Sequence, residues 1–185
     1  MTPGLLLIDL QNDYLARRAL EPDAPELVAR CGRLLDDFRD EGWPVVHCHT
    51  LIRADGTNRM PHWKRAGVWA CVAGTSGAQA PSAVAPHHDE PVVAKSFYSA
   101  FGSGDLDDVL AARSVDVLVM AGLYLHACVS ATTLDAYQRG YEVFIARDAV
   151  AATDERQRAA ATEFLDGRAA QLLDANEIVH KLSRP

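Results

Sequence analysis

Short apolar runs alternate with longer amphipathic stretches along most of the chain. Leu5–Leu10 is a nearly continuous apolar run, which is typical of a strand that is buried on both faces. Five more runs predict strands at Val45–His49, Pro91–Ala94, Val115–Ala121, Glu142–Ala146 and Glu177–His180.

The stretches between these runs predict helices. Asp23 is placed as an N-cap, Glu26 completes a capping box, and Gly42 with Pro44 marks the helix end. Further helices are expected after Ser103, over Ala127–Arg139 and over Asp154–Leu173. This alternation predicts an α/β fold, a three-layer αβα arrangement around a central, mostly parallel six-stranded sheet. Without a repeat or linker, we expect one domain over residues 1–185.

Composition narrows the class of protein. The chain has 185 residues, of which 49% are hydrophobic and 23% charged, and a net charge of −7. An acidic chain without a basic stripe is a poor binder of nucleic acid, and no apolar run has the roughly 18 residues of a membrane span. The N-terminus does not resemble a signal peptide, and the four cysteines form no CxxC pair. We therefore expect a reduced, cytoplasmic protein that acts on a small molecule, without nucleic acid or membrane partners.

Three reactive side chains follow predicted strands. Asp9 ends the first, Lys95 follows the third, and Cys128 follows the fourth at the start of a helix. Because ligands bind at the carboxyl ends of parallel strands, these groups are expected at one rim. A helix N-terminus and an ammonium lower a thiol's pKa, and a carboxylate can accept its proton.

Each residue also has a structural interpretation. Cys128 can be a small buried hydrophobe, Asp9 a turn cap and Lys95 a solvated surface lysine. The shared position at strand ends favours the catalytic interpretation for all three.

Three motifs carry a resemblance to a known family. Residues 6–14 (Leu-Leu-Ile-Asp-Leu-Gln-Asn-Asp-Tyr), 93–95 (Val-Ala-Lys) and 121–129 (Ala-Gly-Leu-Tyr-Leu-His-Ala-Cys-Val) resemble the motifs of the isochorismatase-like cysteine hydrolases. That superfamily includes nicotinamidases, N-carbamoylsarcosine amidases and ureidoacrylate amidohydrolases. The similarity continues to about residue 152, so it covers most of the chain and implies the Rossmann-like fold of that superfamily.

The resemblance also implies roles for residues. It makes Cys128 the nucleophile, Asp9 the general base and acid, and Lys95 the cation that poises both. It implies a cis peptide at Leu123–Tyr124, with the N–H groups of Tyr124 and Cys128 forming an oxyanion hole. Members of the family suggest a homodimer or homotetramer.

The positions of the histidines indicate whether a bound metal ion is expected. Metal-dependent nicotinamidases carry Asp-x-His after the second strand, whereas the stretch here begins at His49 and lacks the aspartate. His47 and His49 alternate along a strand without an obvious third ligand, and His87-His88 lies in a loop. We therefore expect no metal and no cofactor, and this argues against a nicotinamidase.

The long segment 51–90 is expected to shape the pocket or to hide a short helix. It mixes cations with aromatic rings, which suits a carboxylate-bearing or cyclic substrate, although a packed lid or subunit contact is an equal alternative. The expected substrate-binding residues are Gln11, His62, Trp63, Trp69, Tyr124 and His126.

The sequence thus predicts a metal-independent hydrolase that cleaves a C–N bond in a small amide, carbamoyl or ureido compound through a thioester. Isochorismatases carry Gly-Val-Tyr-Ala-His where this chain has Gly-Leu-Tyr-Leu-His (122–126), and they have glycine in place of Cys128. Vinyl-ether hydrolysis with Asp9 as the acid is therefore the alternative. A non-catalytic small-molecule binder on the same fold is a second alternative.

Overall fold

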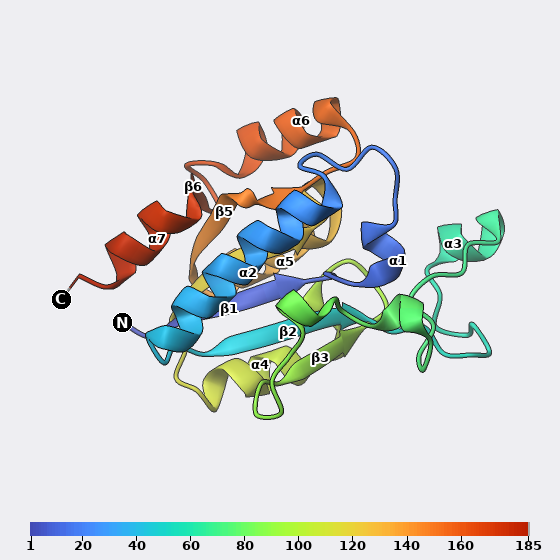
Figure 1. The fold of residues 1–185 in the computed structure, drawn as a ribbon, viewed down its shortest axis with the longest axis horizontal. Coiled ribbons are helices and arrows are strands. Elements are labelled where there is room, and N and C mark those ends of the chain that lie inside the picture. Colours follow the sequence, from blue (N-terminus) through green and yellow to red (C-terminus); the bar gives the residue numbers. More distant parts are fainter. Residues whose placement is uncertain (185) are drawn as a thin grey trace.

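A six-stranded sheet, parallel throughout, forms the centre of the molecule in a computed structural model that describes residues 1–184. The strand order is β3-β2-β1-β4-β5-β6, so the chain starts in the middle and reverses direction once across the sheet (Figure 1). The strands are β1 (Pro3–Ile8), β2 (Val45–Thr50), β3 (Val92–Lys95), β4 (Val117–Leu123), β5 (Glu142–Ala151) and β6 (Gln171–Leu173). The predicted three-layer α/β fold is confirmed.

Helices cover both faces of this sheet. One face packs against α2 (Ala24–Asp40) and α7 (Ala175–Leu182). The other face packs against α4 (Asp105–Ala111), α5 (Ser130–Gln138) and α6 (Glu155–Leu165). The two short helices α1 (Asn12–Leu15) and α3 (Pro61–Ala66) lie instead beyond one end of the sheet.

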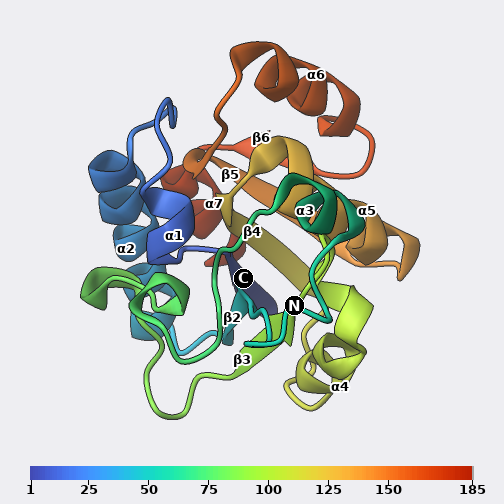
Figure 2. The same ribbon diagram turned by 90° about the vertical axis from the view of Figure 1, so that its right-hand side faces the viewer.

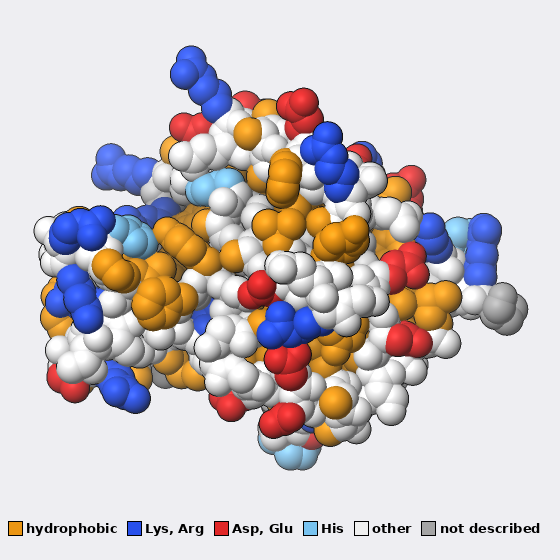
Figure 3. Space-filling view, turned by 180° about the vertical axis from the view of Figure 1, so that it is seen from behind, with side chains coloured by type: hydrophobic (Ala, Val, Ile, Leu, Met, Phe, Trp, Pro, Cys, Tyr) orange, Lys and Arg blue, Asp and Glu red, His pale blue; other side chains and the backbone are white. Residues whose placement is uncertain are grey.

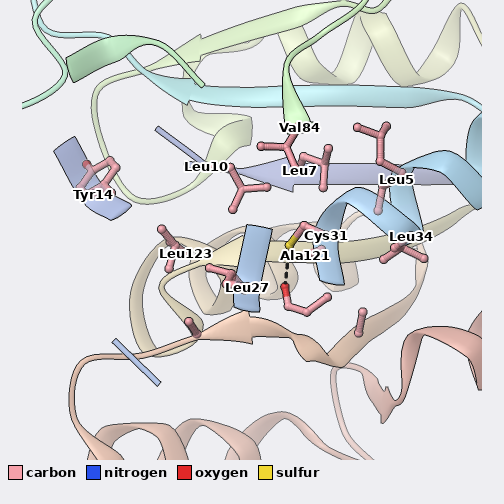
Figure 4. Close-up of a cluster of buried hydrophobic side chains, with 14 of the residues drawn as sticks. Leu5, Leu7, Leu10, Tyr14, Leu27, Cys31, Leu34, Val84, Ala121 and Leu123 are labelled. Carbon is pink, nitrogen blue, oxygen red and sulfur yellow. Dashed lines mark hydrogen bonds between the residues drawn. The ribbon is translucent and has the colours of Figure 1, made fainter. Parts of the chain in front are cut away.

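The alternation of side chains in β1 divides the core. Leu5 and Leu7 point into the cluster that contains α2, while Leu6 and Ile8 point into the cluster on the opposite face. Figure 4 shows the first of these clusters, in which the Cys31 thiol of α2 donates to the Ala149 carbonyl at 3.3 Å. Since β1 is buried on both sides, it needs the unbroken apolar run found in the sequence.

The C-terminal third differs from the sequence prediction. The helix expected over Asp154–Leu173 ends at Leu165, and the sixth strand is Gln171–Leu173. The segment expected as a strand, Glu177–His180, lies in α7. The physical reason is a capping box, in which Asp174 and Glu177 each bond to the other's backbone and start a helix.

The strands end where α1 and α3 lie, and Figure 2 shows this end of the molecule facing the viewer. The segment 51–90 contains α3 and two 3₁₀ turns, Ser76–Ala78 and Ser82–Val84, so the expected short helix is present. None of the helices within residues 1–184 has the length and apolarity to cross a membrane.

Candidate active site

The ends of three strands bring Asp9, Lys95 and Cys128 together. The Lys95 ammonium donates to Asp9 Oδ2 at 2.7 Å and to Cys128 Sγ at 3.3 Å. Asp9 directly follows β1, Lys95 is the last residue of β3, and Cys128 lies in a π-helical turn, Leu125–Val129, after β4. The strand-end rule therefore places these three residues correctly, although 86 positions separate Asp9 from Lys95.

A threonine that the sequence analysis missed joins this group. Thr50 ends β2, and both its N–H and its hydroxyl donate to Asp9 Oδ1, at 3.0 and 2.9 Å. Its oxygen also accepts from Lys95 at 3.0 Å and from the Tyr14 hydroxyl at 3.2 Å. Thr50 follows a predicted strand directly, so the rule that found Lys95 also indicates this residue. It fixes the orientation of the carboxylate.

Burial controls the charges at the site. Burial alone would lower the pKa of Lys95, but the Asp9 carboxylate and Cys128 raise it overall. Burial raises the pKa of the Cys128 thiol, and Asp9 raises it further, while Lys95 opposes both effects. This corrects the expectation of a lowered cysteine pKa, because Cys128 is only 5% exposed. Burial therefore favours the neutral form of the thiol, beside the ion pair of Asp9 and Lys95.

A cavity of about 410 Å³ opens above the sulfur. Four of the expected substrate-binding residues line it, namely His62, Trp63, Tyr124 and His126. Trp63 is buried against the Tyr14 ring, with 6.4 Å between ring centroids. The His62 ring stacks on Tyr98 at the rim, at 6.1 Å.

The structure places the other two expected substrate contacts outside this cavity lining. The side chain of Gln11 is fully buried, donates to the carbonyls of Thr50 and Ala78, and accepts from the Thr50 N–H. It therefore links the segment after β1 to the end of β2 and to the 3₁₀ turn Ser76–Ala78. Trp69 is half exposed and its ring lies 3.8 Å from the Arg59 guanidinium carbon. These two side chains hold protein segments together.

The turn after β4 shapes the floor of the cavity. The peptide bond between Leu123 and Tyr124 is cis, as the resemblance implied. The Tyr124 carbonyl then accepts from the N–H groups of Ala127 and Val129, which closes the π-helical turn around Cys128. Turns of this kind occur frequently at functional sites. The His126 ring stacks on Tyr124, and its Nδ1 is buried with no partner among residues 1–184.

The two strand histidines lie beside each other on β2. The His47 and His49 rings are 6.1 Å apart, and His47 Nε2 lies 2.9 Å from the Glu90 carboxylate. Burial lowers the pKa of both, that of His49 to about 4. Within the described residues, no three His, Cys, Asp or Glu side chains are grouped so that they could hold a metal ion.

Comparison with known proteins agrees with this fold. The family model described as the isochorismatase domain matches residues 3–177. The maleamate amidohydrolase of Pseudomonas putida is 34% identical over 158 residues, which cover 80% of this chain and 71% of that protein. A crystal structure of an isochorismatase family protein from Desulfovibrio vulgaris superposes with a TM-score of 0.90 at 30% identity and covers 99% of each chain. The N-carbamoylsarcosine amidase of Thermoplasma acidophilum gives a TM-score of 0.80 at 27% identity, over 95% of this chain and 98% of that one.

Fold and relatives together define an α/β hydrolase. The chain belongs to the isochorismatase family and is a hydrolase.

Proposed function

We propose that this hydrolase cleaves the C–N bond of a small amide, carbamoyl or ureido compound, with Cys128 as the nucleophile. The observation that carries the proposal is the position of the Lys95 ammonium, which contacts both the Asp9 carboxylate and the Cys128 sulfur beneath an open cavity. A nucleophile, a base and a cation that orients both are the groups that acyl transfer requires. Two relatives whose names describe amide hydrolysis support the same chemistry.

The first half of the reaction transfers the acyl group to the enzyme. Asp9 accepts the thiol proton as the Cys128 sulfur attacks the substrate carbonyl. The negative charge that develops on the carbonyl oxygen is assigned to the backbone N–H groups of Tyr124 and Cys128. Loss of one such donor typically costs about 10²–10³ in rate.

The second half releases the products and restores the site. Protonated Asp9 gives its proton to the leaving nitrogen, the C–N bond breaks, and ammonia or an amine leaves a thioester on Cys128. Asp9 then takes a proton from water, and the hydroxide adds to the thioester carbonyl. Collapse of that adduct expels the sulfur, which recovers the proton from Asp9, and the acid product leaves.

Trapping of the acyl-enzyme tests this proposal. With a panel of small amides, intact-protein mass spectrometry should show an added acyl mass that maps to Cys128. Cys128→Ser should abolish turnover and retain binding. Full activity of Cys128→Ala would reject the nucleophile assignment.

The proposed reaction uses groups of the protein and no metal ion, and this is tested separately. We expect activity to survive dialysis against EDTA, with no stoichiometric metal found by elemental analysis. A bound stoichiometric metal whose removal abolishes activity would contradict this part of the proposal.

Vinyl-ether hydrolysis is the second candidate, because Tyr124 and His126 lie stacked over the cavity in the sequence context of the isochorismatases. In that reaction Asp9 would protonate the substrate and the sulfur would take no part. Retained activity of Cys128→Ala on a vinyl ether would favour it.

A further inference from the structure

The cavity above Cys128 is cationic although the chain as a whole is acidic. Within residues 1–184, its lining includes Arg17 and Arg18 but no aspartate or glutamate, whereas the whole chain has a net charge of −7. Figure 3 shows Lys, Arg and His side chains beside apolar ones at the end that carries α3, on the left of that view. A substrate entering the cavity meets positive charge at its rim.

The two guanidinium groups have no partner inside the protein. Among the described residues, the side chains of Arg17 and Arg18 take part in no ion pair or hydrogen bond, and both are exposed. By contrast, Arg39 and Arg147 bind carboxylates of this chain. Unused donors at the rim of a cavity are available to a ligand.

A short, anchored loop holds these arginines close to the reacting groups. They follow α1, which starts three residues after Asp9. The loop is tied down at Glu21, whose N–H donates to the Ala152 carbonyl at 2.9 Å and whose carbonyl accepts from the Ala152 N–H at 3.1 Å. Burial raises the pKa of Tyr124 to about 12, and the charge of Arg17 opposes that rise. Arg17 therefore acts on the ring that forms the cavity floor.

We propose that Arg17 and Arg18 form a carboxylate-binding subsite, so that the preferred substrate is a small amide or carbamoyl compound with a carboxylate a few atoms from the scissile carbonyl. This inference rests on the function proposed above. A guanidinium offers a planar fork of donors that matches a carboxylate. The cavity, at about 410 Å³, has room for a small molecule whose ends reach both the arginines and the sulfur.

The test compares charged and neutral versions of the same amide. The probes are the monoamides of malonic, succinic and glutaric acid and the methyl ester of each, and the rate is measured as ammonia released. The variants are Arg17→Gln, Arg18→Gln and the double variant. Arg33→Gln is the matched control, because Arg33 is exposed on α2 and lies outside the cavity lining. Equilibrium binding of each probe to Cys128→Ser is measured by calorimetry.

We expect kcat/KM for the best acid to exceed that of its ester about 10- to 100-fold, the range of a hydrogen bond to a charged group. The double variant should lose most of this preference through a higher KM, while the ester and the Arg33→Gln control are unaffected. Equal rates for acid and ester, an unchanged preference in the double variant, or no binding of any acid overturns the subsite. Arginine-dependent binding of an acid without ammonia release keeps the subsite and rejects amide hydrolysis.

Discussion

The contribution of the buried Asp9–Lys95 pair to the free energy of unfolding can be measured separately from its effect on activity. Each side chain is 1% exposed, and the ammonium and carboxylate are 2.7 Å apart. The ammonium also donates to the Thr50 hydroxyl, the Phe97 carbonyl and the Cys128 sulfur. Lys95→Met keeps most of the side-chain length and removes every one of these donors.

The expected cost follows from this burial. At an effective dielectric constant of about 20, two unit charges at this separation attract by about 4–6 kcal/mol. Much of that attraction offsets the desolvation of both ions, but removal of one partner leaves the Asp9 carboxylate buried and uncompensated. We therefore expect Lys95→Met to lower the free energy of unfolding by about 3–5 kcal/mol. Asp9→Asn leaves the ammonium without its carboxylate and should have a cost of similar size.

A double-mutant cycle by urea denaturation checks this reasoning. The double variant Asp9→Asn/Lys95→Met buries no unpaired charge. Its loss of unfolding free energy should therefore be smaller than the sum of the two single losses, by about 2 kcal/mol or more. Its amide hydrolysis should remain abolished. Losses that add within about 0.5 kcal/mol would refute the claim that the two charges are coupled.

Three further predictions concern other parts of the fold and site. Gly122 has φ +116°, and a Cβ there would lie 2.1 Å from the Ile8 carbonyl oxygen, so Gly122→Ala should not fold. A Cβ at Gly102 would have no atom within 4 Å, so the control Gly102→Ala should fold. Circular dichroism and the melting temperature check both variants. Burial opposes ionisation of Glu90, but its bonds to Arg39 and the His87 N–H lower its pKa from 4.5 to about 2. Because the pKa of Glu90 is depressed in the folded state, the Glu90 carboxylate adds about 3 kcal/mol to the free energy of unfolding above pH 4.5, and this is lost as the pH falls toward 2. Glu90→Gln should therefore be less stable than the parent at pH 7. Urea titrations should show this difference in stability closing toward pH 2. Because burial raises the pKa of Cys128, iodoacetamide should alkylate this thiol slowly at pH 7 and faster above pH 9, as followed by peptide mass spectrometry; rapid modification at neutral pH would contradict the burial argument.

The sequence predicts the sheet and the reacting groups because both depend on local patterns. Buried parallel strands require continuous apolar runs, and the residue that follows such a run lies at the rim of the sheet. Asp9 and Lys95 were found in this way, and Thr50 could have been found by the same rule. The strand Gln171–Leu173 was missed because three residues are too short for a periodic pattern.

Other parts of the site depend on long-range packing that no local pattern reveals. Arg17 and Arg18 are ordinary loop residues in the sequence. They line the cavity in a loop that is anchored where Glu21 pairs with Ala152, far away along the chain. Trp69 shows the converse case, since its aromatic ring suggests a substrate contact but packs on Arg59 instead.

In the proposed reaction, the raised pKa of Cys128 makes the thiol depend on both Asp9 and Lys95. With the thiol in the neutral form that burial favours, the site holds one carboxylate and one ammonium, and these charges sum to zero. Transfer of the thiol proton to Asp9 produces a thiolate beside the same ammonium, and the net charge is again zero. A buried site can therefore contain both states without an uncompensated charge, whose cost in a protein interior is several kcal/mol. Without Lys95 each state would carry one unpaired anion, and without Asp9 the proton would have to leave the cavity before the sulfur could attack.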